Sequence, residues 1–335
     1  MVGKTYQAMV VTEETDGSFS RVVKKQVMGA LSEGEVLVKV QFSSLNYKDA
    51  LSATGNRGVT KKYPHTPGVD AAGIVEESRV EGIVPGDSVI VTSYDLGMNT
   101  PGGYGGYVKV PASWVVPLPV GLTLKESMIL GTAGFTAAMS VAALVNQVKP
   151  SAGDIVVTGA TGGVGSIAVA ILAQLGYSVT AVSGKADAGD FLKRLGAAHI
   201  IDRKSAVAGN EKPLLKTLWA GGIDAVGGEM LTAIIKATQP LGLVTCCGNV
   251  ASPDLALNVF PFILRGVSLV GIDSQNCPID YRKEIWRRLA TDWKLTNLEE
   301  MSRQVSLEDL DVEIDLILAG KQKGRVVVNM QGQAE

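Results

Sequence analysis

One stretch near the middle of the chain, Asp154–Ser166 (DIVVTGATGGVGS), constrains the fold more than any other. It opens with Ile155–Val157, an unbroken apolar run that is typical of a parallel strand buried on both faces. The segment that follows, Ile167–Leu175, is apolar and rich in small residues, as expected for a packed helix. Glycines lie at the joint, where they permit a tight turn and close approach of a ligand to the backbone. The stretch therefore predicts a strand, a turn and a helix in succession.

This turn supplies the first candidate ligand contacts. The pyrophosphate of a dinucleotide could rest on the free N–H groups at the start of the helix. An ordinary glycine turn is the alternative, but its position between a buried strand and a helix favours a dinucleotide site. The predicted cofactor-binding residues of the turn are Gly159, Thr161, Gly162, Gly163, Val164 and Gly165.

Length and composition exclude several classes of protein. A chain of 335 residues can form two domains, and its net charge of −2 favours neither nucleic acid nor an anionic membrane as a partner. We find no uninterrupted apolar run near the ~20 residues that span a bilayer, and no signal-peptide pattern. The expectation is a cytoplasmic protein. The three cysteines, Cys246, Cys247 and Cys277, are expected to be small buried side chains without disulfides.

The pattern of hydrophobicity divides the chain. Residues 1–124 have short alternating or apolar segments separated by Gly and Pro, which predicts a β-barrel-like module. Residues 125–272 begin with a helix over 127–143 and then alternate strands and helices, including a helix over 214–220. That alternation predicts a doubly wound parallel sheet of about six strands, with ligand at the carboxyl ends. Residues 273–335 are expected to rejoin the β module, so that the cofactor domain is an insertion.

The end of the second strand of the parallel sheet indicates which dinucleotide is bound. A carboxylate at this place selects NAD, and a cation accommodates the 2′-phosphate of NADP. The strand ends at Ser183-Gly184-Lys185, with Lys185 20 residues after Gly165, and the nearby Asp187 fits an N-cap better. These three residues favour NADPH, although Lys185 also fits a solvated surface lysine. His199 is a further candidate that could border the adenine, with an edge histidine as the alternative.

Four separated motifs resemble one known family over essentially the full length of the chain. They are Ser43–Leu51 (SSLNYKDAL), Pro67–Gly73 (PGVDAAG), Gly131–Ala137 (GTAGFTA) and Pro261–Val267 (PFILRGV). Together they are similar to the medium-chain dehydrogenase/reductase superfamily, and within it to the YhdH/AcuI-type subgroup of NADPH quinone oxidoreductases and acryloyl-CoA reductases. The resemblance implies a GroES-like β-barrel catalytic domain with an inserted Rossmann domain.

The residues at the metal positions of this superfamily argue against zinc. Zinc alcohol dehydrogenases carry Cys where this chain has Asn46, His where it has Val69, and a further Cys near Thr132-Ala133. Three Cys and two widely separated His cannot form either kind of zinc site found in these enzymes. Reduction of an activated C=C bond or of a quinone fits such a chain better than alcohol oxidation.

The resemblance also implies the remaining site residues. Tyr47 is expected to donate to the nicotinamide ribose or the substrate, and Asn46 to contact it as an amide beside Tyr47. A turn asparagine and a packed tyrosine are the alternative. Arg325 is expected to meet a phosphate, or else to form a surface charge pair. The other predicted cofactor contacts are Thr132, Gly248, Asn249, Ile263 and Ser274.

The predicted function is hydride transfer from NADPH to an α,β-unsaturated thioester such as acryloyl-CoA, without zinc. Two alternatives stay open. The first is an NADPH quinone oxidoreductase with the same cofactor site. The second is a non-catalytic NADPH-binding redox sensor or structural protein. The resemblance also implies a homodimer. The apolar strand Val267–Ile272 would lie at the edge of the sheet, where it has to be covered or paired, so the two copies are expected to join there.

Overall fold

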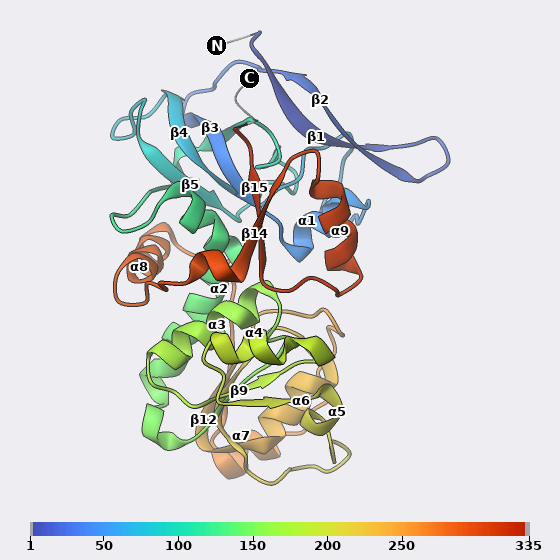
Figure 1. Ribbon diagram of the computed structural model, residues 1–335, viewed down its shortest axis with the longest axis vertical. Coiled ribbons are helices and arrows are strands. Elements are labelled where there is room, and N and C mark those ends of the chain that lie inside the picture. Colours follow the sequence, from blue (N-terminus) through green and yellow to red (C-terminus); the bar gives the residue numbers. More distant parts are fainter. Residues whose placement is uncertain (1–2, 332–335) are drawn as a thin grey trace. The chain divides into compact units, whose positions relative to one another are not determined.

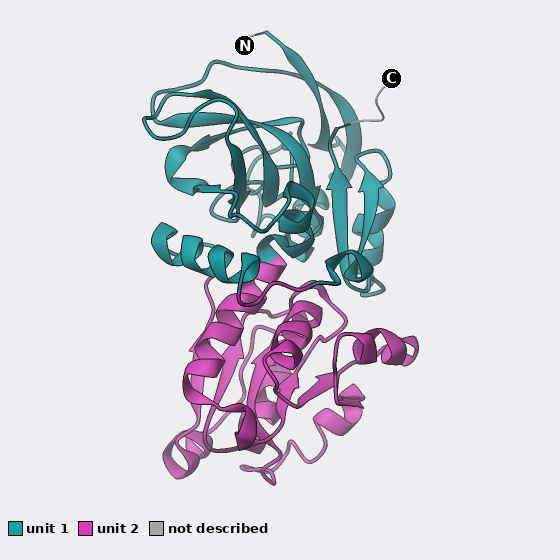
Figure 2. Cartoon of the chain, turned by 60° about the vertical axis from the view of Figure 1, so that its left-hand side comes forward, with its two compact units in different colours: residues 1–132, 275–291, 296–335 teal, residues 133–274, 292–295 magenta. Residues whose placement is uncertain are grey.

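The computed structural model describes residues 3–331 and divides them into two compact units. Unit 1 contains residues 3–132, 275–291 and 296–331, and unit 2 contains residues 133–274 and 292–295 (Figure 2). The sequence predicts an inserted domain over residues 125–272, whereas unit 2 begins at residue 133 and ends its main segment at residue 274. Residues 1, 2 and 332–335, which belong to the predicted β module, lie outside the described residues.

Unit 2 is built on a parallel sheet of six strands in the order β10-β9-β8-β11-β12-β13 (Figure 1). The order reverses between β8 and β11, which confirms the predicted doubly wound sheet. The strands are β8 (Ile155–Val157), β9 (Val179–Val182), β10 (His199–Ile201), β11 (Trp219–Asp224), β12 (Thr238–Cys246) and β13 (Ser268–Gly271).

Helices alternate with the strands of unit 2, as in the β-α-β units from which doubly wound sheets are built. The apolar side of α6 packs on the sheet, where Ile234 and Leu231 join a cluster with Val156 and Val244. The helices are α3 (Gly163–Gln174), α4 (Gly189–Arg194), α5 (Arg203–Ala206), α6 (Gly228–Ala237) and α7 (Phe260–Arg265), with 3₁₀ turns η2 (Pro150–Ala152) and η3 (Ala186–Ala188).

The predicted helix over residues 214–220 is wrong. The segment is extended and enters β11 at Trp219. The N–H of Leu215 donates to the carbonyl of Lys236 (3.1 Å), and that of Leu218 donates to Ala237 (2.8 Å). Because these N–H groups pair with the end of α6, they are not available for bonds within a helix.

Unit 1 contains a mixed sheet of seven strands in the order β14-β15-β3-β4-β5-β7, with β6 also paired to β3. Buried valines of β3, β4, β5 and β6 form its core. The strands are β3 (Glu35–Ser44), β4 (Asp70–Ser78), β5 (Ser88–Thr92), β6 (Tyr107–Pro111), β7 (Val115–Pro117), β14 (Ser302–Ser306) and β15 (Arg325–Asn329). The C-terminal strands thus return to the β module, since β15 pairs with β3.

A hairpin of β1 (Thr5–Glu13) and β2 (Phe19–Val27) forms a separate two-stranded sheet (Figure 1). Met9 and Val11 of β1 pack in a second core with Leu310 and Ile314. The remaining elements of unit 1 are α1 (Tyr47–Ala53), α8 (Ile279–Ala290), α9 (Leu310–Leu318) and the 3₁₀ turns η1 (Ala112–Trp114) and η4 (Leu298–Met301).

Helix α2 (Leu124–Gln147) contains the point at which the chain passes from unit 1 to unit 2. Its backbone is not helical at Gly131 (φ 51°, ψ −158°), so the helix is broken one residue before Thr132. By length and composition α2 could cross a membrane, but 83% of its most apolar window is buried inside the protein. A long apolar helix that is buried in this way is typical of a protein core.

Candidate functional site

The glycine turn of unit 2 has the geometry of an anion-binding site. Gly159 has a positive φ of 56°, and α3 begins after its N-cap, Gly162. A Cβ at Gly165 would lie 2.4 Å from the carbonyl oxygen of Gly159, so only glycine fits there. Within residues 3–331 no side chain caps the start of α3, which leaves the N–H groups of its first turn available to an anion. The predicted Thr161 and Val164 lie in this turn and at the start of α3.

Two cations lie at the end of β9, close to the predicted adenosine ribose. The Ser183 hydroxyl accepts a hydrogen bond from the Lys185 N–H (3.1 Å), which fixes the loop after β9. A Cβ at Gly184 would lie 2.8 Å from Arg203 Nε, so the Arg203 side chain lies against the backbone of Gly184. Sequence analysis missed Arg203, although its place directly after β10, the neighbour of β9, was a usable signal.

Asp224, at the end of β11, is a second residue that sequence analysis missed. Its Oδ1 accepts from the Thr158 hydroxyl (2.7 Å), and its Oδ2 accepts from the N–H groups of Val226 (3.1 Å) and Gly227 (2.7 Å). Asp224 is fully buried, and burial raises the pKa of its carboxyl group. It therefore ties the end of β8 to the turn after β11, at the place where strand order reverses.

The predicted Gly248 and Asn249 line a hollow of about 450 Å³ that also includes Gly227 and Leu269. These residues follow or lie near the carboxyl ends of β11, β12 and β13, the edge at which doubly wound folds bind ligands. The predicted Ser274 lies after β13, where its hydroxyl accepts from the Thr136 hydroxyl (2.8 Å).

The cysteines of unit 2 line the same hollow, but their environment keeps them protonated. The Cys247 thiol donates to the carbonyl of Asp224 (3.3 Å). Burial and the nearby Asp224 carboxylate raise the pKa of Cys247 to about 12, and the same two causes raise the pKa of Cys246. Cys246, Cys247 and Cys277 form no disulfide within residues 3–331, and neither thiol of the Cys246-Cys247 pair is a nucleophile at neutral pH.

Two predicted cofactor residues lie away from the carboxyl edge. The side chain of His199 is 63% exposed at the start of β10, and its Nε2 lies 3.9 Å from Asp154, which precedes β8. Ile263 is 69% exposed on α7, whose Arg265 reaches the carbonyls of Lys236 and Thr238 at the start of β12. Both therefore belong to the side of the sheet where strands begin, and we remove them from the predicted cofactor contacts.

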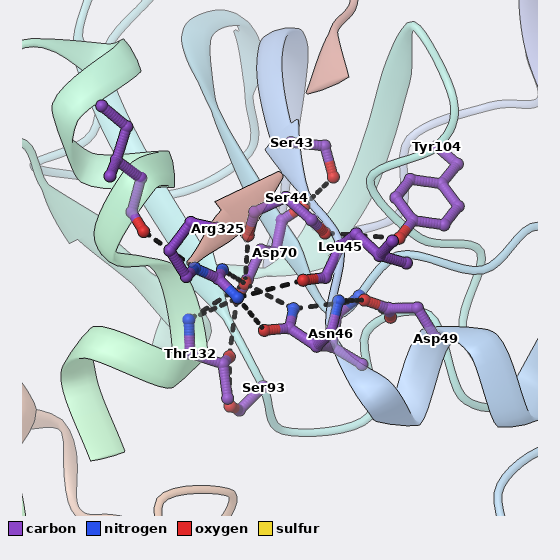
Figure 3. Close-up of polar contacts among 12 residues, drawn as sticks. Ser43, Ser44, Leu45, Asn46, Asp49, Asp70, Ser93, Tyr104, Thr132 and Arg325 are labelled. Atoms are coloured by element: carbon purple, nitrogen blue, oxygen red, sulfur yellow. Dashed lines mark hydrogen bonds and ion pairs between the residues drawn. The ribbon is translucent and has the colours of Figure 1, made fainter. Parts of the chain in front are cut away.

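In unit 1 the predicted site residues gather around Asp70, at the start of β4 (Figure 3). Asp70 is fully buried. Its Oδ2 accepts from the Ser44 hydroxyl (2.6 Å) and from Asn46 Nδ2 (2.8 Å). Its Oδ1 accepts from the Thr132 hydroxyl (2.6 Å), and the Thr132 N–H lies within 3.0 Å of both oxygens. One carboxylate thus holds β3, the start of α1 and the break in α2 together.

The amide group of Asn46 makes all its hydrogen bonds within this cluster, and Asn46 is only 9% exposed. Its Nδ2 donates to Asp70 and also to Asp49 Oδ2 (3.1 Å), while its Oδ1 accepts from Arg325 Nη1 (3.2 Å). Because both amide hydrogens and the carbonyl oxygen are occupied, Asn46 has no donor for a substrate. The predicted catalytic role of Asn46 is corrected to a structural one.

Asp49 lies in the first turn of α1, and its carboxylate joins the cluster. Its Oδ2 accepts from the N–H of Asn46 (2.8 Å), and its Oδ1 accepts from the N–H of Val69 (2.8 Å). Full burial, and next the charge of Asp70, raise the pKa of Asp49 to about 7 despite these donors.

Arg325, at the start of β15, is 2% exposed and does not face solvent. Its Nε donates to the Ile129 carbonyl (2.9 Å), its Nη1 donates to the Leu45 carbonyl (3.0 Å), and its Nη2 lies 3.9 Å from Asp70 Oδ2. A guanidinium that is enclosed in this way cannot reach a cofactor phosphate. The predicted phosphate contact of Arg325 is therefore wrong, as is the alternative of a surface charge pair.

Tyr47 and Thr132 are the predicted residues of unit 1 that keep access to solvent. Both are half-buried, whereas the residues around them are buried. Among residues 3–331 no group hydrogen-bonds the hydroxyl of Tyr47, which is the first residue of α1. The same part of the chain contains no group of three or more His, Cys, Asp or Glu placed to hold a metal ion.

Comparison with known families matches both units. Residues 32–120 match the alcohol dehydrogenase GroES-like domain, and residues 163–291 match the family described as zinc-binding dehydrogenase.

Comparison with individual proteins covers nearly the whole chain. Acrylyl-CoA reductase AcuI of Ruegeria pomeroyi and the putative quinone oxidoreductase YhfP of Bacillus subtilis are each 43% identical over 97% of this chain and 99% of their own.

Solved structures agree with these matches. YhfP with NAD bound aligns with a TM-score of 0.94 at 42% identity, over 97% of this chain and 99% of its own. YhdH of Salmonella enterica in complex with NADP aligns with a TM-score of 0.93 at 40% identity, over 97% of this chain and 100% of its own.

These matches extend over both units and confirm the resemblance carried by the four sequence motifs. They also confirm the predicted combination of a GroES-like domain with a Rossmann sheet of six strands. The chain belongs to the medium-chain dehydrogenase/reductase superfamily and, within it, to the group of oxidoreductases that includes YhdH, YhfP and AcuI.

Proposed function

We propose that this oxidoreductase uses NADPH to reduce an activated C=C bond, with acryloyl-CoA or a similar enoyl thioester as the acceptor. The observation that carries the proposal is the carboxyl edge of the unit 2 sheet, where an uncapped helix start lies beside Lys185 and Arg203. Such an edge suits a dinucleotide with an additional phosphate. The 43% identity to AcuI over nearly the full length of both chains supports the acceptor class.

The choice of NADPH over NADH depends on the end of β9. Relatives of this chain have been crystallised with NADP and, in the case of YhfP, with NAD. Here the end of β9 offers the Ser183 hydroxyl, Lys185 and Arg203, and a phosphate is recognised by such a set of donors.

When bound, NADPH would supply the hydride to the β-carbon of the acceptor. The contribution of the chain is to hold the cofactor on the turn between Gly159 and Gly165, and to present the groups of unit 1 that face solvent. Tyr47 is the proposed catalytic donor, since its hydroxyl has no hydrogen-bonding partner among the described residues and remains available for the ribose or the thioester oxygen.

The residues at the metal positions of the superfamily fit a reductase without zinc. Asn46 gives both its amide hydrogens to carboxylates, Val69 has no ligand atom in its side chain, and the Thr132 hydroxyl donates to Asp70. Asn46 and Thr132 thus both donate to the carboxylate of Asp70, where a zinc ion would need thiolate or imidazole ligands.

Steady-state oxidation of NADPH against a panel of acceptors tests this proposal. The panel should contain acryloyl-CoA, longer enoyl-CoAs, simple enones and a benzoquinone. We expect kcat/KM to be highest for acryloyl-CoA or another short enoyl-CoA. Turnover with the quinone alone would support the alternative of an NADPH quinone oxidoreductase, which the 43% identity to YhfP favours.

Binding of NADPH without turnover of any acceptor would identify the protein as a non-catalytic NADPH-binding protein and reject both enzymatic proposals. A cytoplasmic location and a homodimeric state complete the proposal.

A further inference from the structure

The turn after β5 contains two consecutive residues with strained backbones. Ser93 has a φ of 62° and Tyr94 a φ of 50°, a left-handed conformation that is unfavourable for side chains other than glycine. A turn of this kind persists only where its surroundings hold it in place, and strain of this type is concentrated at functional sites.

Contacts on several sides hold the strained turn. The Ser93 N–H donates to the Val69 carbonyl (2.7 Å), and the Tyr94 N–H donates to the Gln275 carbonyl (3.2 Å). The Tyr94 ring stacks on Trp114 with centroids 5.5 Å apart, and the Arg282 guanidinium lies 4.3 Å from the centre of the same ring. These contacts can offset a strain of about 1–3 kcal/mol per residue.

The strained turn directs one group toward the candidate site. The Ser93 hydroxyl lies 2.8 Å from the Thr132 hydroxyl (Figure 3). Since Thr132 gives its hydroxyl hydrogen to Asp70 (2.6 Å), the Ser93 hydroxyl is the donor to Thr132. The hydrogen bonds therefore run in one direction, from Ser93 to Thr132 to Asp70.

Exposure distinguishes Thr132 from its two partners. Ser93 is 4% exposed and Asp70 is fully buried, whereas Thr132 is half-buried. Of these three side chains, Thr132 is thus the one that a ligand could touch, and its hydroxyl is held from both sides. We propose that Ser93 is a positioning residue that fixes Thr132 for hydride transfer, and that the strain of the Ser93-Tyr94 turn is retained for this purpose.

This inference rests on the proposed function and on the predicted contact between Thr132 and the cofactor. Replacement of Ser93 by glycine tests it, because Ser93→Gly removes the hydroxyl and relieves the strain at the same time. A purely structural serine would leave kcat unchanged after this replacement. Leu241→Gly is the matched control, since Leu241 also has a φ of 62° and is 73% exposed.

The variants should be compared with the wild type using the best acceptor in the panel, so that a failure of the acceptor proposal is seen first in the wild type. We measure kcat, KM for NADPH, Tm and the primary isotope effect with NADPH deuterated at the transferred position. For Ser93→Gly we expect an unchanged or higher Tm, a fall in kcat of about 10-fold and a larger isotope effect. Leu241→Gly should raise or keep Tm and leave kcat unchanged.

Two further variants separate the hydroxyl from the fold. Thr132→Ser keeps the hydroxyl and should keep most of the wild-type kcat, whereas Thr132→Val should lower kcat as Ser93→Gly does. An unchanged kcat and isotope effect in Ser93→Gly would overturn the proposal. A fall in kcat that accompanies a lower Tm, with no change in the isotope effect, would overturn it as well.

Discussion

Asp49 and Asp70 place two carboxyl groups in one buried cluster beside the guanidinium of Arg325. Asn46 lies between them and donates to both, so that the cluster is satisfied mainly by amide, hydroxyl and backbone donors. Buried carboxyl groups that share one cation cannot both be ionised without cost. The free energy of unfolding should therefore depend on whether Asp49 is protonated.

The free energy of unfolding should depend on pH through Asp49. Its pKa is about 7 in the folded protein and near 3.8 in the unfolded chain, so the folded state binds the proton more tightly. The contribution of Asp49 to stability is full below pH ~3.8 and is lost as pH rises toward and through 7. Urea unfolding between pH 5 and 8 should show this decrease in the wild type relative to Asp49→Asn.

The comparison with the variant is needed because another group acts in the opposite direction. Burial lowers the pKa of His65 below its usual 6.5. Protonation of His65 therefore makes the folded protein less stable as the pH falls below 6.5. His65 is common to the wild type and Asp49→Asn, so it cancels in the difference. Equal slopes for the two proteins would contradict the raised pKa of Asp49.

Arg203 and Lys185 should together set the preference for NADPH over NADH. Each charge-assisted hydrogen bond to a phosphate contributes about 1.5–3 kcal/mol, which corresponds to at least about 10-fold in the ratio of kcat/KM values. We expect Arg203→Ala and Lys185→Ala each to lower this ratio while leaving kcat/KM for NADH nearly unchanged. Arg194→Ala, at the exposed end of α4, removes a similar charge and should leave the ratio as it is. An unaltered ratio in both Arg203→Ala and Lys185→Ala would show that neither side chain contacts the 2′-phosphate.

At the scale of secondary structure, sequence periodicity located the elements whose side chains face a core. The strand, the turn and the helix around Gly159 were predicted correctly. The residues 214–220 were misassigned because apolar content does not reveal that backbone donors are used by α6.

The same reasoning explains which site residues could be predicted. The glycines of the turn carry a local signal, since conformation and close approach require them. Asp224 and Ser93 act through contacts with residues far away in sequence, and no pattern in the chain marks such contacts. Asn46 and Arg325 were found, but their burial, and with it their role, depends on the way in which β3, β4 and β15 pair.

Within the turn between β8 and α3, two glycines should respond differently to alanine. In Gly165→Ala the new Cβ would lie 2.4 Å from the Gly159 carbonyl oxygen, while in Gly162→Ala its nearest neighbour would be 3.3 Å away. We expect Gly165→Ala to lower Tm and to abolish NADPH binding, and Gly162→Ala to lower Tm much less. Thermal unfolding and a fluorescence titration with NADPH would show this. A Tm for Gly165→Ala equal to that of the wild type would contradict the close approach.

At the scale of the whole molecule, one edge of the unit 2 sheet is a candidate surface for binding a second copy of the chain. β13 is the last strand in the order and pairs only with β12 among the described strands. Beside it, Val259, Ile263 and Leu264 on or next to α7 are 58%, 69% and 63% exposed. An apolar edge of this kind is normally covered or paired. The exposure of Ile263, on the side of the sheet where the strands begin, thus fits a surface for a second copy of the chain.

The predicted homodimer can be tested by light scattering coupled to size-exclusion chromatography. The wild type should elute with twice the mass of one chain, and Ile263→Asp and Leu264→Asp should shift it toward the monomer. Val27→Asp is the matched control, because Val27 is 68% exposed on β2, and it should leave the mass unchanged. A monomeric wild type at micromolar concentration would reject the dimer.

The central claim is that the hydride of NADPH reaches the β-carbon of an enoyl thioester. Incubation of the enzyme with acryloyl-CoA and NADPH deuterated at the transferred C4 position, followed by NMR of the product, tests it most directly. The account predicts propionyl-CoA with one deuterium on the β-carbon and none on the α-carbon. Deuterium on another position, or no propionyl-CoA from an enzyme that still binds NADPH, would contradict it.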